Sequence, residues 1–309
     1  MDNDMQTRLL FIYTETSLHA GTGSGLSAVD LPIQRERTTQ YPNIQGSGVK
    51  GSLRSQCTAP DDEKDAVFGP DTKNGSDHAG AVSVGEARIV LFPVRSLAGI
   101  FAYTVCPHVL ARLKREAQRA GLEVNWNVPP VSESECLVTA SSTVIANNKV
   151  VLEEFSFTAQ QDSNADAIAE WLAGCLPEGS EYDYWHNKVK DSLVILPDDA
   201  FRDFVVNSTE VTTRVRIIPD SKTVQQGALW TQEALPADTL MVSAITARRL
   251  RLPTKNDREE IIKDIPNELG QGIASEVLNW LISLENMPPR LQIGGDETTG
   301  SGQVALRWL

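Results

Sequence analysis

Two glycine-rich stretches near the N-terminus have residue types that suit phosphate binding. Gly21-x-Gly23-x-Gly25 resembles a dinucleotide-binding loop in composition, but that loop requires a further glycine at position 26, where the chain has Leu26. It also requires a helix next, and Pro32 interrupts the segment. In the second stretch, residues 46–52, Gly51 is followed directly by Ser52, whereas a P-loop has Gly-Lys-Ser/Thr. The spacing therefore argues against both common nucleotide sites.

The second stretch still has features that favour contact with a phosphate backbone. Gly46-Ser47-Gly48 gives backbone N–H groups close access, because a glycine has no Cβ to obstruct a phosphate. Lys50 and Arg54 lie four residues apart on a predicted helix over 48–57, so they share one side of it. The N-terminus of a helix is itself electropositive. The alternative is that these glycines only form tight turns.

The charge of the whole chain opposes a nucleic-acid partner, but its distribution does not. Forty-one acidic and 28 basic residues give a net charge of −13. Binding depends on the local surface, however, and basic residues concentrate in the segments 35–54 and 112–119. The composition permits an RNA-binding face and does not require one.

Cysteine and histidine usage argues against a zinc site and against disulfides. The four cysteines and four histidines are scattered and form no CxxC or HExxH motif. The N-terminus has no basic start followed by an apolar run, as a secretory signal would. The most apolar stretch, 97–106, is too short to span a bilayer. We therefore expect a cytoplasmic protein with no membrane partner.

Hydrophobic patterning predicts strands mixed with helices in a single domain over 1–309. The expected strands include residues 9–13, 81–94, 99–105, 136–145 and 150–157, and the expected helices are 48–57, 108–120 and 269–284. The polar segment 58–80, rich in Asp, Gly and Pro, is predicted to be a mobile loop. Residues 121–200 are predicted to be an insertion with minor structure of its own. We find no internal repeat and no linker.

A β-hairpin is predicted over about 210–236. Val211, Val215 and Ile217 alternate with polar residues at strand period, and Arg214 and Arg216 lie on one face. A turn at 219–222 lets the chain return toward Trp230, for which packing at the base of the hairpin is the favoured role. Two further short strands, 291–293 and 303–309, are expected to flank the glycine-rich loop 294–302.

Six segments, in order along the chain, resemble one protein family. The sequence HAGTGSGLSAVDLPIQRE at 19–36 and QGSGVKGSLR at 45–54 are the most specific, and the others are 79–88, 93–99, 227–236 and 294–302. Together they resemble the backbone RAMP subunits of type III-B (Cmr) CRISPR effector complexes. The matched segments extend over nearly the whole chain.

The resemblance implies an α+β fold with an RRM-like (ferredoxin-like) palm, inserted fingers and a β-hairpin thumb. It implies that copies stack in a filament along guide (CRISPR) RNA, beside other Cmr subunits, and cut single-stranded target RNA at regular intervals. Mg²⁺ or another divalent cation is the expected cofactor. The arginines of the hairpin, Arg214 and Arg216, and the loop glycines Gly294, Gly295 and Gly300 are then expected to contact RNA.

The resemblance also places the catalytic aspartate at Asp30, where it would hold the metal ion near the scissile phosphate. RNA cleavage requires deprotonation of the 2′-OH, stabilisation of the phosphorane and protonation of the leaving oxygen. His19, eleven residues before Asp30, is a second catalytic candidate for proton transfer. Without the resemblance, Asp30 would be interpreted as a turn residue, and His19 could equally be a histidine that caps or packs beside the glycine turn. Glu233 is a weaker acidic candidate.

Two other functions stay open. One alternative is a guide-binding scaffold without catalysis. The other is a RAMP endonuclease that processes guide RNA as a monomer. A processing enzyme usually depends on histidine and does not need the long hairpin, so the segment 210–236 favours a backbone subunit. Multimers that form only on RNA would distinguish a backbone subunit from a processing enzyme.

Overall fold

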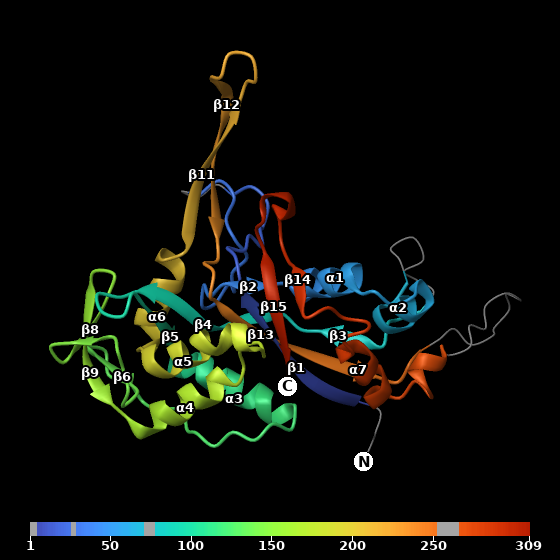
Figure 1. The fold of residues 1–309 in the computed structure, drawn as a ribbon, viewed down its shortest axis with the longest axis horizontal. Coiled ribbons are helices and arrows are strands. Elements are labelled where there is room, and N and C mark those ends of the chain that lie inside the picture. Colours follow the sequence, from blue (N-terminus) through green and yellow to red (C-terminus); the bar gives the residue numbers. More distant parts are fainter. Residues whose placement is uncertain (1–4, 26–28, 71–77, 252–265) are drawn as a thin grey trace, which may run out of the picture.

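A large mixed β-sheet organises the computed structural model, which describes residues 5–25, 29–70, 78–251 and 266–309. Thirteen of the described strands belong to this sheet, in the order β14-β15-β1-β13-β4-β5-β10-β6-β9-β8-β7, with β2 paired to β4 and β3 to β13 (Figure 1). Most neighbours are antiparallel, while β10 with β5 and β6 with β9 are parallel. The predicted α+β class is confirmed.

The strands of this sheet have the following bounds: β1 Met5–Thr14, β2 Asn43–Ile44, β3 Val82–Val84, β4 Ala87–Arg95, β5 Phe101–Val105, β6 Glu135–Val138, β7 Ile145–Ala146, β8 Lys149–Leu152, β9 Phe155–Gln161, β10 Leu193–Ile195, β13 Leu240–Arg248, β14 Arg290–Gln292 and β15 Gln303–Trp308. Strand β1 lies between β13 and β15. Its residues from Leu9 to Thr14 are all buried, which requires cover on both faces. This explains why the sequence shows a continuous apolar run there rather than alternation.

The helices flank the sheet and include α1 Gly46–Gln56, α2 Asp61–Phe68, α3 Pro107–Arg119, α4 Ser163–Ala173, α5 Asp183–Ser192, α6 Asp198–Asn207 and α7 Ala274–Ile282. Short 3₁₀ turns are formed by Ser180–Tyr182, Asn267–Leu269 and Glu297–Thr299. Helix α3 has the predicted apolar face, with Leu110, Leu113 and Ala117 buried. Both α3 and α7 pack against β1. No helix in the described ranges is long and apolar enough to cross a membrane.

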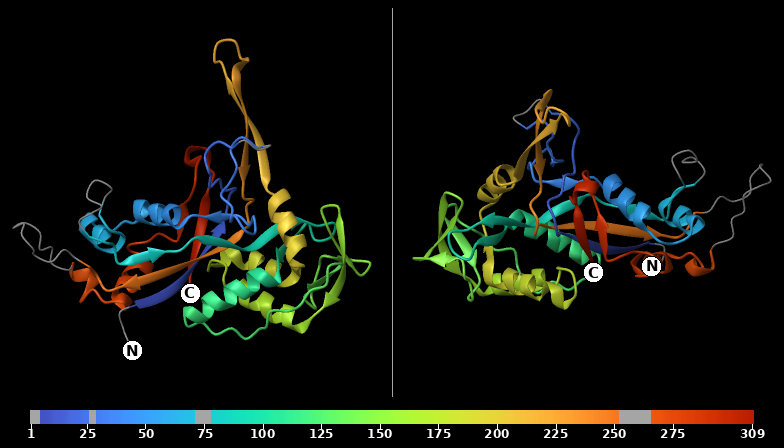
Figure 2. Two further views of the ribbon diagram at one scale, coloured as in Figure 1. Left: turned by 180° about the vertical axis from the view of Figure 1, so that it is seen from behind. Right: turned by 45° about the horizontal axis from the view of Figure 1, so that its top comes forward.

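The predicted hairpin is present and projects from the body of the molecule (Figures 1 and 2). Strands β11 (Glu210–Ile217) and β12 (Val224–Ala234) pair antiparallel, with Arg214 opposite Trp230. Its outer part displays apolar side chains to solvent, and Leu229 is 65% exposed. Only the base of β12, at Gln232 and Glu233, is buried. The hairpin is therefore anchored at one end.

Two predictions about the segments around the sheet need correction. Within 58–80, residues 61–68 form helix α2, so the prediction of a loop is wrong there, and residues 71–77 lie outside the described residues. Helix α2 forms because Glu63 accepts a hydrogen bond from the Trp280 indole at 2.5 Å and Phe68 packs on the same ring. The predicted helix 269–284 begins only at Ala274, because Glu276 accepts a hydrogen bond from the N–H of Ile273 and caps it.

The segment 121–200, predicted to be an insertion with minor structure, contains β6 to β10 and helices α4 and α5. Its strands continue the large sheet, since β10 pairs with both β5 and β6. The segment thus extends the main sheet and shares its core.

Candidate functional site at the base of the hairpin

Three consecutive residues of β12 each contact a different segment of the chain at the base of the hairpin. Thr231 bonds to Asp30, Gln232 donates to Asp296 at 2.6 Å, and the carbonyl oxygen of Glu233 bonds to His19. Both predicted catalytic residues and the C-terminal glycine loop therefore meet one strand. Figure 1 shows the blue N-terminal segment and the red C-terminal loop beside β12.

Asp30 is held by a reciprocal set of hydrogen bonds. Its carboxylate Oδ2 accepts from the Thr231 N–H at 2.7 Å and from the Thr231 hydroxyl at 2.9 Å. The Asp30 N–H in turn donates to the same hydroxyl oxygen at 3.0 Å. Directly after Asp30, the backbone of Leu31 makes two bonds to β12: its N–H donates to the Thr231 carbonyl, and its carbonyl accepts from the Glu233 N–H. The carboxylate is exposed yet fixed in position.

These bonds favour the charged form of the carboxyl group. The Thr231 N–H and then its hydroxyl lower the pKa of Asp30 below its ordinary value. A carboxylate with a lowered pKa is ionised throughout the neutral range and is a weak Brønsted base. Asp30 is thus suited to hold or orient a positively charged or hydrogen-bond-donating group, more than to remove a proton.

His19 contacts the same strand but does not bond to Asp30. Its Nδ1 lies 2.6 Å from the carbonyl oxygen of Glu233. A carbonyl only accepts, so Nδ1 carries the proton and, in the neutral ring, Nε2 is the acceptor. Asp30 and His19 use β12 residues two positions apart, roughly 7 Å along the strand. Among the described contacts there is no hydrogen bond between the two side chains.

The carboxylate of Glu233 is nearly buried and makes contacts that stabilise the fold. Its carboxylate is 8% exposed and pairs with Arg35 at 2.5 Å. It also accepts from the Thr209 hydroxyl at 2.7 Å and from the Ile33 N–H at 3.0 Å. Both oxygens are therefore engaged in joining the hairpin base to the segment that follows Asp30.

The C-terminal glycine loop packs directly against the His19 segment. The Gly295 N–H donates to the His19 carbonyl at 3.0 Å. A Cβ on Gly294 would lie 2.5 Å from that same carbonyl oxygen, and the φ of Gly294 is +90°, so any other residue there would be strained. Asp296 then joins the loop to the hairpin, because it pairs with Arg214 at 3.0 Å.

The predicted phosphate-binding residues at the start of α1 lie together. Gly46, Ser47 and Lys50 line one open cavity of about 530 Å³. A Cβ on Gly46 would approach the Val84 carbonyl oxygen to 2.3 Å, so close packing on β3 accounts for this glycine. Lys50 donates to the Val82 carbonyl at 3.3 Å, and burial, with Arg54 nearby, lowers the pKa of its ammonium group.

Arg54 has partners within the protein. It pairs with Asp65 at 2.6 Å and donates to the carbonyl oxygens of Lys64 and Gly69. These contacts tie α1 to both ends of the last turn of α2. Its predicted role in binding RNA stays a prediction, and such a role would compete with these contacts.

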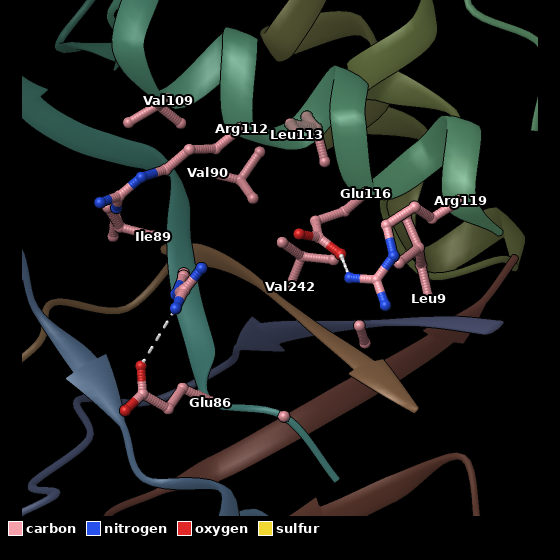
Figure 3. Close-up of a pocket in the computed structure, with 13 residues that line it drawn as sticks. Leu9, Glu86, Ile89, Val90, Val109, Arg112, Leu113, Glu116, Arg119 and Val242 are labelled. Carbon is pink, nitrogen blue, oxygen red and sulfur yellow. Dashed lines mark hydrogen bonds and ion pairs between the residues drawn. The ribbon is translucent and has the colours of Figure 1, made fainter. Parts of the chain in front are cut away.

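Arg112 and Arg119 of α3 line a separate cavity of about 210 Å³ between α3 and the sheet (Figure 3). Arg119 pairs there with Glu116, and Arg88 with Glu86. None of the described residues that line this cavity is a predicted site residue. The base of the hairpin therefore remains the candidate site.

Comparison with known proteins identifies the family of the chain. The family model of the RAMP superfamily matches residues 11–305. A Pyrococcus furiosus protein, named CRISPR system Cmr endoribonuclease Cmr4, is 38% identical over 310 residues, covering 98% of this chain and 95% of the relative. The chain belongs to the Cmr4 family of RAMP proteins. A Saccharolobus solfataricus protein named CRISPR system CMR subunit Cmr4 is 24% identical over 97% of this chain and 95% of its own length.

Solved structures of Cmr4 proteins have the same fold. The crystal structure of oligomeric Cmr4 from Pyrococcus furiosus superposes with a TM-score of 0.70 at 30% identity, covering 98% of both chains. A chain in a cryo-electron microscopy structure of the type III-B Cmr-beta complex bound to cognate target RNA gives a TM-score of 0.71. That chain is 22% identical and covers 99% of this one and 98% of its own length, which shows the fold alone.

The described residues of this Cmr4-family protein provide few side-chain ligands for a metal ion. They contain no group of three or more His, Cys, Asp or Glu side chains arranged to hold one. Asp30 provides one carboxylate, whose Oδ1 accepts no hydrogen bond in the described part of the chain. This fits a Mg²⁺ ion that takes most of its ligands from water and phosphate, as Mg²⁺ commonly does with one or two carboxylates.

Sequence reasoning missed the residues that hold the site together. Thr231, Gln232 and Asp296 received no role, because each acts through a contact to a segment far away in the chain. The available signal was that Thr231 and Gln232 lie inside the segment 227–236, and Asp296 inside 294–302, both of which resemble the family.

Proposed function

We propose that this chain is the repeating backbone subunit of a type III-B effector complex, and that it holds guide RNA and cuts complementary single-stranded target RNA at regular intervals. Copies of the chain line up along the guide, beside other Cmr subunits, in the cytoplasm and away from membranes. One observation carries the assignment: 38% identity over nearly the full length of a relative named as a Cmr endoribonuclease.

In this proposal Asp30 supplies the ionised carboxylate at the scissile phosphate. The side chain is exposed at the base of the hairpin, and the bonds from Thr231 keep one of its oxygens oriented. The carboxylate is already held in position, so it can orient the 2′-OH or a bound cation without a change of its own conformation during the reaction. The lowered pKa of Asp30 keeps it charged well into the acidic range.

His19 is proposed to assist proton transfer through Nε2. The bond from Nδ1 to the Glu233 carbonyl fixes the ring orientation and the tautomer, as the positioning partner of a catalytic histidine does. A divalent ion, proposed to be Mg²⁺ with Asp30 as its protein ligand, would stabilise charge on the phosphate when bound.

The RNA itself is proposed to follow the hairpin and the adjoining surface. In the terms of the family, the sheet is an RRM-like palm with inserted fingers and the hairpin is the thumb. The exposed apolar side chains of β11 and β12 suit insertion between bases, and Arg214 and Arg216 suit the phosphates. The cavity formed by Gly46, Ser47 and Lys50, with Gly48 and Arg54 beside it, suits the guide backbone. The glycines of the loop, Gly294, Gly295 and Gly300, suit close approach of RNA.

The test is cleavage of target RNA by the reconstituted complex that contains either the wild-type chain or Asp30→Ala, in Mg²⁺ and in EDTA. We expect the regular cuts to disappear with Asp30→Ala and with EDTA, while guide and target binding are retained. Asp199→Ala, which removes an exposed aspartate on α6, is the matched control and should cut normally. Unchanged cutting by Asp30→Ala would overturn the catalytic role.

A second function is an RNA-holding scaffold without catalysis, which would need the exposed apolar side chains of the hairpin, such as Leu229 at 65% exposure, and would not need Asp30. The same experiment separates the two functions. A scaffold predicts normal target binding together with cutting that does not depend on Asp30.

A further inference from the structure

Thr231 is the only residue whose backbone and side chain both bond to the Asp30 carboxylate among the described contacts. We infer that Thr231 is the positioning residue that holds Asp30 at the base of the hairpin in the orientation needed for target-RNA cleavage. The inference rests on the proposed function and adds to it a residue that neither the sequence nor the family resemblance singled out.

The Thr231 hydroxyl group acts as both donor and acceptor toward Asp30. Its hydrogen is donated to Asp30 Oδ2 at 2.9 Å, and its oxygen accepts the Asp30 N–H at 3.0 Å. Only serine and threonine can do both from this position with a hydroxyl group. A free aspartate on an exposed loop would sample several side-chain rotamers, whereas this reciprocal pair favours one.

The contact joins Asp30 to Thr231, which lies 201 positions later on strand β12 of the hairpin. Asp30 therefore has its bound orientation only when the base of β12 is docked beside it. The hairpin is also the element that meets RNA in the proposed function. Thr231 thus couples the placement of the hairpin to the orientation of the carboxylate.

The backbone around Thr231 is expected to survive loss of the hydroxyl. Leu31 donates to the Thr231 carbonyl at 3.0 Å and accepts from the Glu233 N–H at 3.0 Å, so two main-chain bonds keep the segments together. Valine has the shape of threonine and suits a strand. Thr231→Val therefore removes the hydroxyl bonds to Asp30 while it keeps the strand in place.

The experiment uses complexes reconstituted with Thr231→Val, Thr231→Ser, Asp30→Ala or the wild-type chain. Thr158→Val, the same substitution at an exposed position of β9, is the control. Single-turnover cleavage of target RNA is measured for each complex, with target binding measured in parallel. We expect Thr231→Val to cut roughly 10- to 100-fold more slowly, because small misplacement of a catalytic group has effects of that size. Thr231→Ser should restore most of the rate, and Thr158→Val should match the wild type.

Two readouts separate positioning from a general loss of structure. Target binding by the Thr231→Val complex should match the wild type, because the main-chain bonds of Leu31 keep the base of the hairpin in place. Thr231→Ser, which keeps the hydroxyl group, should recover cutting, whereas a merely unstable protein would lose binding and cutting together.

Each outcome decides the inference separately from the proposed function. If Asp30→Ala is inactive while Thr231→Val cuts at the wild-type rate, the role of Thr231 is refuted and the proposed function stands. If Asp30→Ala cuts normally, the proposed function fails first. Thr231→Ala, which lacks both the hydroxyl and the branched methyl group, is the second variant, and it should show the same loss of cutting with target binding retained if Thr231→Val does not assemble.

Discussion

Replacement of Glu233 by alanine should destabilise the protein strongly, because its carboxylate joins the hairpin to the segment after Asp30. The side chains of Glu233 and Arg35 are 8% and 14% exposed and form an ion pair at 2.5 Å. Alanine would remove the partner of a nearly buried guanidinium group. It would also leave the Ile33 N–H and the Thr209 hydroxyl without their acceptor.

The expected size follows from these contacts. Removal of one partner from a buried ion pair costs about 3–5 kcal/mol. Arg35 keeps hydrogen bonds to the carbonyl oxygens of Gln40 and Val205, at 2.9 and 2.8 Å, so the lower end applies. We expect the free energy of unfolding to fall by about 3 kcal/mol for Glu233→Ala, and by about 1–2 kcal/mol for Glu233→Gln, which keeps an acceptor oxygen.

Denaturant unfolding of the purified chain, followed by tryptophan fluorescence, measures the change. Glu154→Ala, at an exposed position in the turn between β8 and β9, is the control and should leave stability unchanged within about 0.5 kcal/mol. A Glu233→Ala chain as stable as the wild type would refute the structural role and return Glu233 to the list of candidate acids.

Three further predictions follow from other contacts. Arg54→Met should lower the thermal stability of the chain without RNA, because the ion pair with Asp65 is lost. A variant that unfolds at the wild-type temperature and differs only in guide binding would contradict this prediction. Asp296→Asn should weaken the ion pair with Arg214, and faster hydrogen exchange at the base of β12 should report it, whereas unchanged exchange would count against the contact as an anchor. Burial raises the pKa of Asp238, so its contribution to stability is greatest below the ordinary pKa of aspartate and falls as the pH rises through the raised value. Asp238→Asn should remove this decline with pH in unfolding measurements, and an unaltered decline would refute it.

Local pattern sufficed where an element is organised by its own residues. Helix α3 was predicted because Leu110, Leu113 and Ala117 recur at helical spacing, and all three are buried. The hairpin was predicted from alternation between Val211 and Ile217 and is present as β11 and β12. In both cases the signal is the periodicity of the element itself.

Pattern failed where a distant residue decides the structure. Helix α2 is short and acidic, and its sequence reads as a loop until Trp280, 217 residues away from Glu63, packs against it. The ion pair of Arg54 with Asp65 was missed for the same reason, because Asp65 lies on that unpredicted helix. The predicted contact of Arg54 with RNA stays a prediction.

The candidate site divides in the same way. The resemblance identified Asp30, and His19 was proposed from its position eleven residues before Asp30; the structure places both against β12. What orients them is Thr231 and the carbonyl of Glu233, which are separated from them by 201 and 214 residues. Strand pairing over such distances cannot be derived from composition or periodicity.

The most direct test of the account is target-RNA cleavage by complexes assembled from mixtures of wild-type and Asp30→Ala chains. If each copy makes its own cut through Asp30, cleavage at every regular site should fall in proportion to the fraction of variant chain and vanish when all copies carry the substitution. Regular cutting that persists in complexes made entirely of Asp30→Ala chains would contradict the account.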